Sequence, residues 1–427
     1  MIRIYDGKNI RDEEIFARSE EQANVAPAVA AIIADVRENK DKALFAYTEK
    51  FDHVSLSSLL VSEKEIEEAV ESVDPVLLEV MSEAAQNIAA YHEKQIRHDF
   101  SMMEKEGVVL GQRVLPLERV GVYVPGGTAA YPSTVLMDTV PARLAGVKEI
   151  IMVTPPSKDG TISPNILAAA YIAGITRIYK VGGAQAVAAL AYGTESIPAV
   201  DKIVGPGNAY VAEAKKQVFG QVGIDMVAGP SEVLIIADGK SNPRYVAADL
   251  LSQAEHDRMA SAVLITDSME LAKQVQAEIE TQLSTLEREA IARPSIDNNG
   301  KIIVTNDLND AAKVSNRIAP EHLELCVDDP FALLNQITNA GSVFLGRWNP
   351  EPMGDYFAGP NHTLPTMGTA RFYSPLSVDD FVKKMQYSYF TKDALAKDAL
   401  KVSLFARSEG LTAHARAIEI RFEDEEE

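Results

Sequence analysis

Four of the seven histidines of this 427-residue chain lie after residue 255, in segments rich in acids, amides, glycine and proline. These histidines and the acids that accompany them are His256, Glu321, His322, Asp355, His362, Glu409 and His414. Imidazole, amide and carboxylate groups are the ligands of zinc-type metal sites. A further His and Glu beside such a site form the usual pair for proton transfer. The distribution therefore indicates a metalloenzyme whose site is built from four distant segments.

One pair of candidate ligands lies within a single segment, DLLSQAEHD (249–257). Gln253 and His256 are spaced i, i+3, which on a helix puts both side chains on one face, about 5–6 Å apart at Cβ. They could therefore bind one ion together, although an ordinary polar helix face shows the same spacing. Asp355 and His414 could complete the ligand set, but spacing alone does not show that they converge.

A second signal is the adjacent pair Glu321-His322, which follows Pro320 and precedes an apolar Leu-Glu-Leu. This pattern predicts a short helical start that presents two proton acceptors side by side, or simply a capped helix start. Two such groups with separated pKa values can perform acid and base steps at neutral pH. Ser231, in AGPSEVLIIAD (228–238), is either a substrate-binding hydroxyl or a turn residue, because the segment lacks the Gly-x-Ser-x-Gly motif of hydrolases.

The elements that must position these residues alternate between strand and helix. Val- and Ile-rich runs, each followed by a helical pattern, predict two sets of strands, at 119–124, 149–154, 176–181, 202–205 and 232–237, and near 262–266, 302–304 and 342–346. This alternation predicts parallel sheets covered by helices on both faces. The first hundred residues read as helical, with a helix starting at Pro75, and so does the chain past residue 377, through SVDDFVKKM and 394–407.

Three glycine-rich turns follow consecutive predicted strands: VPGG (124–127), VGGAQ (181–185) and VGPGN (204–208). None is the dinucleotide-binding fingerprint, since Tyr210 takes the place of the third glycine and no acid follows on the next strand. Each turn alone could be structural. Three at consecutive strand ends favour a shared cofactor crevice, with Tyr123, Gln185 and Asn208 beside it.

The composition excludes several classes of protein. A net charge of −21, from 62 acids against 41 bases, argues against binding to nucleic acid or anionic membranes. We find no apolar stretch long enough to cross a bilayer and no signal-peptide pattern at the N-terminus. The single cysteine, Cys326, excludes an internal disulfide, suits a reducing cytoplasm, and lies in a run that reads as a short structural strand.

Six segments in order resemble one family, histidinol dehydrogenase, over almost the whole chain. They are IDMVAGPSEVLIIAD (224–238), DLLSQAEHD, APEHLEL (319–325), GSVFLG (341–346), GDYFAGPNHTLPT (354–366) and LTAH (411–414). The resemblance implies a zinc- and NAD-dependent enzyme that performs the four-electron oxidation of L-histidinol to L-histidine through L-histidinaldehyde, the final step of histidine biosynthesis. It also implies a cytoplasmic homodimer with shared active sites.

The resemblance also implies a role for each matching residue. The zinc ligands would be Gln253, His256, Asp355 and His414, and the proton acceptors would be Glu321 and His322. The NAD contacts would be Tyr123, Gln185 and Asn208. Substrate contacts would be Ser231, His322, His362 and Glu409 together with the four zinc ligands.

For the fold, the resemblance implies an α/β protein with two incomplete Rossmann-like parallel-sheet domains plus helical N-terminal and C-terminal segments. We expect an N-terminal extension at 1–20, a first domain with the metal and catalytic residues at 21–122 and 233–376, and a second, NAD-contacting domain at 123–232. A helical segment at 377–427 would carry the last metal ligand.

Two other functions are compatible with the same residues. A zinc hydrolase would use Glu321 to activate a metal-bound water on an amide, but it has no need for a dinucleotide crevice. A metal-dependent dimeric scaffold would leave Glu321, His322 and His362 without a purpose.

Overall fold

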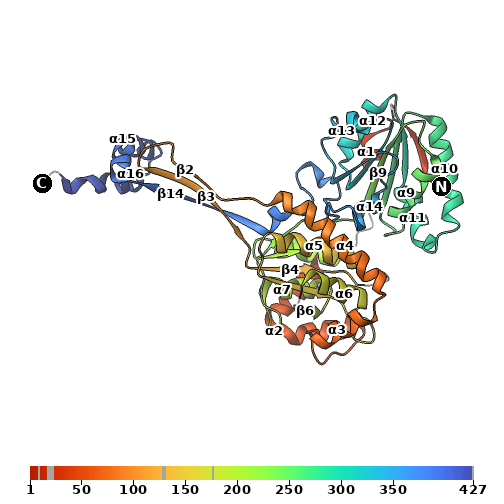
Figure 1. Cartoon of the computed structure of the whole chain (residues 1–427), viewed down its shortest axis with the longest axis horizontal. Coiled ribbons are helices and arrows are strands. Elements are labelled where there is room, and N and C mark those ends of the chain that lie inside the picture. Colours follow the sequence, from red (N-terminus) through yellow and green to blue (C-terminus); the bar gives the residue numbers. More distant parts are fainter. Residues whose placement is uncertain (8–9, 17–23, 127–130, 176, 426–427) are drawn as a thin grey trace. The chain divides into compact units, whose positions relative to one another are not determined.

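The computed structural model describes residues 1–7, 10–16, 24–126, 131–175 and 177–425. Contact density divides the chain into two compact units. The first comprises residues 1–96 and 117–381, and the second comprises residues 97–116 and 382–427. The first unit holds two parallel sheets, each covered by helices on both faces (Figure 1). The α/β fold class predicted from the alternation of strands and helices is therefore confirmed.

The first sheet contains five strands in the order β6-β5-β4-β7-β8. Their bounds are β4 Arg119–Tyr123, β5 Glu149–Thr154, β6 Arg177–Lys180, β7 Lys202–Val204 and β8 Gly223–Ile224. All the pairings are parallel, and β4 lies at the centre because the chain moves first to one side of it and then to the other. This order creates a switch point between β4 and β7, where parallel sheets bind ligands at their carboxyl ends.

Helices cover both faces of the first sheet. One face packs against α3 (Glu63–Ser72), α4 (Pro75–His92), α5 (Pro132–Leu144) and α6 (Pro164–Ala173). The other packs against α2 (Ala26–Asp52), α7 (Gly183–Tyr192) and α8 (Ala209–Val218). Helix α4 starts at Pro75, as predicted, and Asp74 caps it by accepting a hydrogen bond from Val76 N.

The second sheet contains six strands in the order β1-β11-β10-β9-β12-β13, all parallel. Their bounds are β1 Arg3–Asp6, β9 Glu232–Ala237, β10 Ser261–Thr266, β11 Lys301–Val304, β12 His322–Cys326 and β13 Ser342–Leu345. One face packs against α9 (Pro243–Ala254), α10 (Met269–Leu283) and α11 (Glu289–Asn299). The other packs against α1 (Asp12–Phe16), α12 (Leu308–Ile318) and α13 (Pro330–Leu334), and α14 (Glu351–Tyr356) follows β13.

The packing differs from the expected domain division. Residues 21–122 were expected to join 233–376, but α2, α3 and α4 pack against the first sheet, where their apolar faces complete both cores. Residues 3–6, expected in an N-terminal extension, form β1 at the edge of the second sheet. Residues 17–23 lie outside the described part of the chain. The central strands β9, β10 and β12 are buried along their whole length, as expected for parallel strands between two helical layers.

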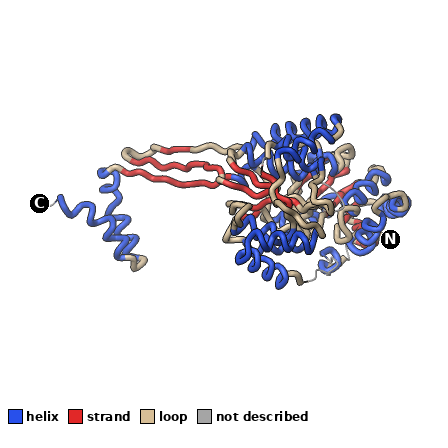
Figure 2. The backbone as a smooth tube through the Cα atoms, turned by 90° about the horizontal axis from the view of Figure 1, so that it is seen from below, coloured by secondary structure: helices blue, strands red, loops and turns tan. Residues whose placement is uncertain are grey.

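The second unit combines an antiparallel sheet with helices. Its strands β2 (Phe100–Met102), β3 (Val108–Pro116) and β14 (Val382–Phe390) pair in the order β14-β3-β2 and form the ribbon of strands in Figure 2. Helices α15 (Lys392–Ser408) and α16 (Thr412–Glu419) follow, and the short 3₁₀ segment η4 (Ile420–Glu425) ends the described chain. The helix at 394–407 is confirmed by α15.

The helix predicted from SVDDFVKKM is wrong. Asp380 does accept hydrogen bonds from the backbone N and the hydroxyl of Ser377, but it closes only the 3₁₀ turn η3 (Val378–Phe381). The chain then extends as β14, because nine residues pair with β3. Long-range strand pairing overrode the local capping signal. No helix in the described residues is long and apolar enough to cross a membrane.

The core of the first sheet generates a stability prediction. Gly121 lies in β4 beneath Leu190 of α7, and a Cβ added there would lie 2.8 Å from Leu190 Cδ1. We expect Gly121→Val to lower the free energy of unfolding by about 1–3 kcal/mol through overpacking, measured by urea denaturation. Adding Leu190→Ala should restore part of the lost free energy of unfolding, because it removes the side-chain atoms that the valine would contact. Equal denaturation midpoints for wild type and Gly121→Val would contradict this packing.

Candidate active site

The candidate site is organised around two hydrogen bonds to the backbone of Glu232. His322 is the first residue of β12 and pairs with Val233 of β9, so its ring lies beside the start of β9. His322 Nδ1 lies 3.0 Å from Glu232 O, and Glu232 N donates to Glu321 Oε2 at 2.8 Å. A carbonyl oxygen only accepts, so Nδ1 must carry the proton and donate. Nε2 of the neutral ring is therefore left with a lone pair.

The helical start predicted at Glu321-His322 is not present. Gly341 N and Ser342 N donate to Pro320 O and Glu321 O, both at 2.9 Å, and extend the pairing with β13 to the residues ahead of β12. The pair therefore enters a parallel sheet, as the apolar Leu-Glu-Leu that follows allows. Both side chains are buried, with Glu321 7% and His322 3% exposed.

Two carboxylates of α14 face Nε2 of His322. The distance from Nε2 to Asp355 Oδ1 is 3.6 Å, and the distance to Glu351 Oε1 is 3.7 Å. Ligand atoms of these three residues lie within 4.8 Å of one another, which makes them a possible metal-binding group within the described chain. Sequence reasoning missed Glu351. Its i, i+4 spacing from Asp355, which puts both on one helix face, was the signal that could have found it.

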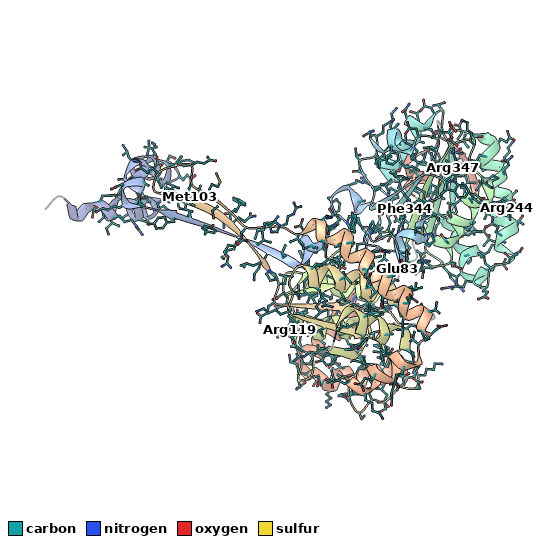
Figure 3. All side chains as sticks on the ribbon, in the orientation of Figure 1. Glu83, Met103, Arg119, Arg244, Phe344 and Arg347 are labelled. Carbon is teal, nitrogen blue, oxygen red and sulfur yellow. The ribbon has the colours of Figure 1, made fainter. Side chains whose placement is uncertain are left out.

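The short helix α14 is held in place by contacts from the second sheet. Glu324 of β12, fully buried, accepts a hydrogen bond from Glu351 N at 2.9 Å. Phe344 of β13, labelled in Figure 3, has its ring centroid 6.1 Å from that of His322. A Cβ on Gly354 would lie 2.5 Å from Phe344 Cε1, so glycine is needed for this approach. These contacts fix Asp355 and Glu351 against His322.

Burial and mutual charge separate the pKa values of the clustered groups. Burial raises the pKa of Glu321 to about 8 and, with the charge of Asp355, that of Glu351 to about 9. Burial opposes the charged form of His322, but Glu321, Asp355 and Glu351 outweigh it and raise its pKa to about 10. Burial also opposes ionisation of Asp355, yet contact with His322 and the charge of that ring lower its pKa. Asp355 is thus the ionised carboxylate of the cluster.

His256 lies within reach of the charges of this cluster, and Gln253 is in the adjoining helical turn. Gln253 is in the last turn of α9, 1% exposed, and its Oε1 is buried without a hydrogen-bond partner among the described residues. His256 lies in the turn just beyond the helix, with its N bonded to Gln253 O at 3.2 Å, so only part of the predicted helical pair is helical. Burial lowers the pKa of His256, and the charges of Asp355 and His322 reach it. A neutral imidazole and an unpartnered amide oxygen suit metal ligation.

His362 and Ser231 complete the neighbourhood. His362 Nδ1 donates to Asp355 O at 3.1 Å, and its Nε2 lies 3.4 Å from Thr134 Oγ1 of α5. Burial lowers the pKa of His362, so the ring is neutral at pH 7. Ser231 directly precedes Glu232 and its carbonyl accepts from Ser261 N. These residues gather at the amino ends of β9, β12 and β13, whereas parallel sheets usually bind ligands at their carboxyl ends.

A separate cavity of about 1160 Å³ lies at the carboxyl ends of β4, β5 and β6 in the first sheet. Tyr123, Gln185 and Asn208 all line it, so the structure brings these three predicted residues together. Tyr123 Oη accepts a hydrogen bond from Gly183 N at 3.0 Å. Asn208 is the N-cap of α8, and its side-chain oxygen accepts from Tyr210 N and Val211 N, which leaves its amide group for a ligand.

The glycine-rich turns around this cavity have a packing role. A Cβ on Gly126 would lie 2.3 Å from Pro155 Cγ, and one on Gly182 would lie 2.6 Å from Pro155 Cβ. Pro155 is thus wedged between the turns after β4 and β6. Gly205 has φ of 111°, and a Cβ there would lie 2.1 Å from Tyr123 O. Close packing therefore explains why these positions are glycine. The turns nevertheless form one wall of the cavity. Gly127 of VPGG lies outside the described residues.

The two remaining predicted residues belong to the second unit. Glu409 is the C-cap of α15 and His414 lies in α16. Gln253, His256, Asp355 and the Glu321-His322 pair all belong to the first unit. Within the first unit, the charge of Asp355 reaches His256, and His256 N is bonded to Gln253 O. The metal-binding role of all four predicted zinc ligands stays a prediction.

The fold and these sites define an α/β protein with a large cavity on one sheet and a buried cluster of His, Glu and Asp on the other. Comparison with known proteins identifies its family. The sequence profile of histidinol dehydrogenase matches residues 16–422. A histidinol dehydrogenase from Bacillus cereus is 58% identical over 404 residues, which cover 95% of this chain and 94% of the relative. One from Listeria innocua is 55% identical over 412 residues, 96% of each chain.

Structural comparison agrees. The crystal structure of histidinol dehydrogenase from Elizabethkingia anophelis matches with a TM-score of 0.94 and 40% identity, covering 100% of this chain and 99% of that one. The chain belongs to the histidinol dehydrogenase family, so it is an oxidoreductase of histidinol oxidation in histidine biosynthesis.

The raised pKa values predict how stability depends on pH in the presence of a chelator. The folded protein keeps Glu321 and Glu351 protonated to about pH 8 and 9, whereas the unfolded chain loses these protons near 4.5. The protonated His322 likewise stabilises the fold below about 6.5, and this contribution is lost as pH rises towards 10. All three terms make the free energy of unfolding fall with rising pH.

We therefore expect the urea midpoint of the chelated protein to fall between pH 5.5 and 8.5. In Glu321→Gln the fall should be smaller, because one buried group no longer titrates. A wild-type midpoint that is constant or rises over this interval would contradict the assigned protonation states.

Proposed function

We propose that this protein oxidises L-histidinol to L-histidine through L-histidinaldehyde with two molecules of NAD and one zinc ion per chain. The observation that carries the proposal is the orientation of His322. Its Nδ1 is bound to Glu232 O, so the lone pair of Nε2 faces the carboxylates of α14, with Glu321 adjacent. A buried base beside a second buried carboxyl group is what two successive oxidations at one carbon require.

His322 and Glu321 would divide the proton transfers between them. In the first oxidation, Nε2 of His322 takes the hydroxyl proton of the bound alcohol. In the second, Glu321 takes a proton from the water that adds to the aldehyde, and His322 takes the hydroxyl proton of the resulting gem-diol. The hydrogen bond to Glu232 O holds the ring in one orientation for both steps. NAD, when bound, supplies the hydride acceptor for each oxidation.

The residues present fit a zinc ion. Gln253 Oε1, His322 Nε2 and Glu351 Oε1 are buried without hydrogen-bond partners in the described chain, which is costly unless a ligand satisfies them. We propose Gln253, His256 and Asp355, with His414, as the ligands. Zinc would supply an orienting template for the substrate's nitrogens. Positive charge near Asp355 would also lower the pKa values of His322 and Glu321 from those of the metal-free protein, and so favour the roles of both as bases.

The cavity of the first sheet fits NAD. Its volume of about 1160 Å³ suits a large ligand, and Gly182 and the amide of Asn208 offer donors to a pyrophosphate. Tyr123 and Gln185, 4% and 2% exposed, would fix its orientation from the cavity wall. A zinc hydrolase would leave this cavity unexplained.

We also propose a homodimer with shared active sites. The second unit exposes large apolar side chains, including Met103, Tyr389, Phe390, Leu404 and Phe405. An apolar groove there is lined by Phe390, Val402 and Phe405. Exposed apolar patches of this kind mark interaction sites, and a second copy of the chain is the occupant that family resemblance implies. His414 and Glu409, from this unit, would then contribute to zinc and substrate binding.

The other proposed features follow from composition. Small-molecule substrates and a net charge of −21 accord with a protein that binds neither nucleic acid nor membranes. The lone, buried Cys326 accords with residence in the reducing cytoplasm.

Replacement of the proposed acid–base pair should reduce turnover without loss of metal. We expect Glu321→Gln and His322→Asn to lower kcat by ~10²–10⁴-fold, the typical contribution of a general acid or base. Zinc content, measured by atomic absorption, should stay at the wild-type level, since neither residue is a proposed ligand. Loss of zinc in the His322 variant would make His322 a ligand and remove it as the base.

The stoichiometry of coenzyme reduction separates the proposal from its alternatives. We expect two NADH per histidinol consumed, followed by absorbance with histidine quantified in parallel. One NADH per histidinol would indicate an ordinary alcohol dehydrogenase, and none would favour the hydrolase.

A further inference from the structure

The cavity of the first sheet contains a carboxylate that the dinucleotide-binding pattern of the sequence lacks. In doubly wound sheets, an acid after the second strand usually accepts a hydrogen bond from the adenosine ribose. The second strand here is β5, and the residues that follow it are Thr154, Pro155 and Pro156, none of them acidic. Asp52 lines the same cavity, but it comes from the last residue of α2.

Asp52 is placed over the half of the sheet where adenosine binds in such folds. Helix α2, which ends at Asp52, packs against α7, the helix that follows β6. The chain after α2 then reaches Leu60, which forms an isolated bridge to Tyr179 of β6. The cavity walls here include Tyr123, Pro155 and Gly182, one from each end of β4, β5 and β6. The ends of the first three strands of the sheet therefore line the same cavity as the carboxyl group.

The Asp52 carboxyl group has no structural partner in the described protein. Its Oδ2 is buried without a hydrogen bond. Burial raises the pKa of Asp52 to about 6, opposed only in part by the charge of His53. An acid at the C-terminus of a helix is also unfavourable, because the helix dipole is negative there. The Asp52 carboxylate therefore does not stabilise the fold, whereas a ligand hydroxyl could donate a hydrogen bond to its unpaired Oδ2.

We propose that Asp52 selects the coenzyme, by accepting a hydrogen bond from the adenosine ribose 2′-hydroxyl of NAD and by repelling the 2′-phosphate of NADP. This inference rests on the proposed NAD-dependent function and assigns a specificity residue to it. The side chains that line the cavity near Asp52 are suited to bind the adenine base. Tyr47 and Phe51 stack at 5.6 Å and Ile162 and Ile166 are apolar, which suits a base.

Two lysines line the same cavity, one on the helix of Asp52 and one on the loop after β5. Lys50 Nζ lies 5.2 Å above the Phe51 ring, and Lys158 comes from the loop after β5. Neither lysine forms an ion pair with Asp52 in the described chain, so no lysine neutralises the carboxylate that would face the ribose.

The test is a comparison of ligand affinities in the full-length protein, measured by isothermal titration calorimetry. The ligands are NAD, its analogue lacking the adenosine 2′-hydroxyl, and NADP. The variant is Asp52→Asn, which keeps size and removes charge. The matched control is Glu49→Gln, an exposed acid of the same helix that does not line the cavity.

We expect Asp52→Asn to weaken NAD binding about tenfold, the effect of a hydrogen bond to a charged group. Binding of the 2′-deoxy analogue should be unchanged, and the preference for NAD over NADP should fall at least tenfold. Glu49→Gln should behave as wild type. Equal effects on NAD and the 2′-deoxy analogue, or no effect on either, would overturn the role of Asp52. A wild-type protein that binds no NAD would instead refute the proposed function itself.

Discussion

The backbone of Glu232 is the constraint on which the candidate active site depends. Its N–H holds Glu321 and its carbonyl holds Nδ1 of His322, so one residue of β9 fixes both members of the pair. The parallel register of β9 and β12 makes this contact unavoidable, because it sets His322 opposite Val233. The consequence is chemical: whenever the ring of His322 is neutral, the fold decides its tautomer, and the lone pair of Nε2 faces Asp355.

Both sheets contribute to a single functional arrangement within the first unit. Asn361 donates to Met137 O and Thr363 donates to Asp138, so the segment that carries His362 is bound to α5 of the first sheet. Asp225, on the chain that leaves that sheet, accepts from Gly205 N and forms an ion pair with the buried Lys215. The first sheet and the candidate acid–base cluster are therefore connected through buried polar contacts, which are costly to break.

Much of this could be predicted from sequence, for a physical reason. Periodicity located the strands because parallel strands between helical layers are continuously apolar. Family motifs marked His322 and Asp355, which the fold brings within 3.6 Å of each other. The helix starts predicted from local capping patterns at Ser377 and Glu321 were wrong. Both residues precede strands, because long-range strand pairing overrides the local preference. Glu351 carries no motif, and Asp52 is distant in sequence from the turns it joins, so only the fold could place them beside their sites.

The most direct test of the account is the tautomer of His322, read from ¹⁵N chemical shifts of histidine-labelled, zinc-loaded protein. The resonance is assigned by its loss in His322→Asn. The account predicts a neutral ring protonated at Nδ1, with Nε2 unprotonated and not bound to metal, since a carbonyl accepts from Nδ1. A ring protonated at Nε2, or one with the shift of a zinc-bound Nε2, would contradict it.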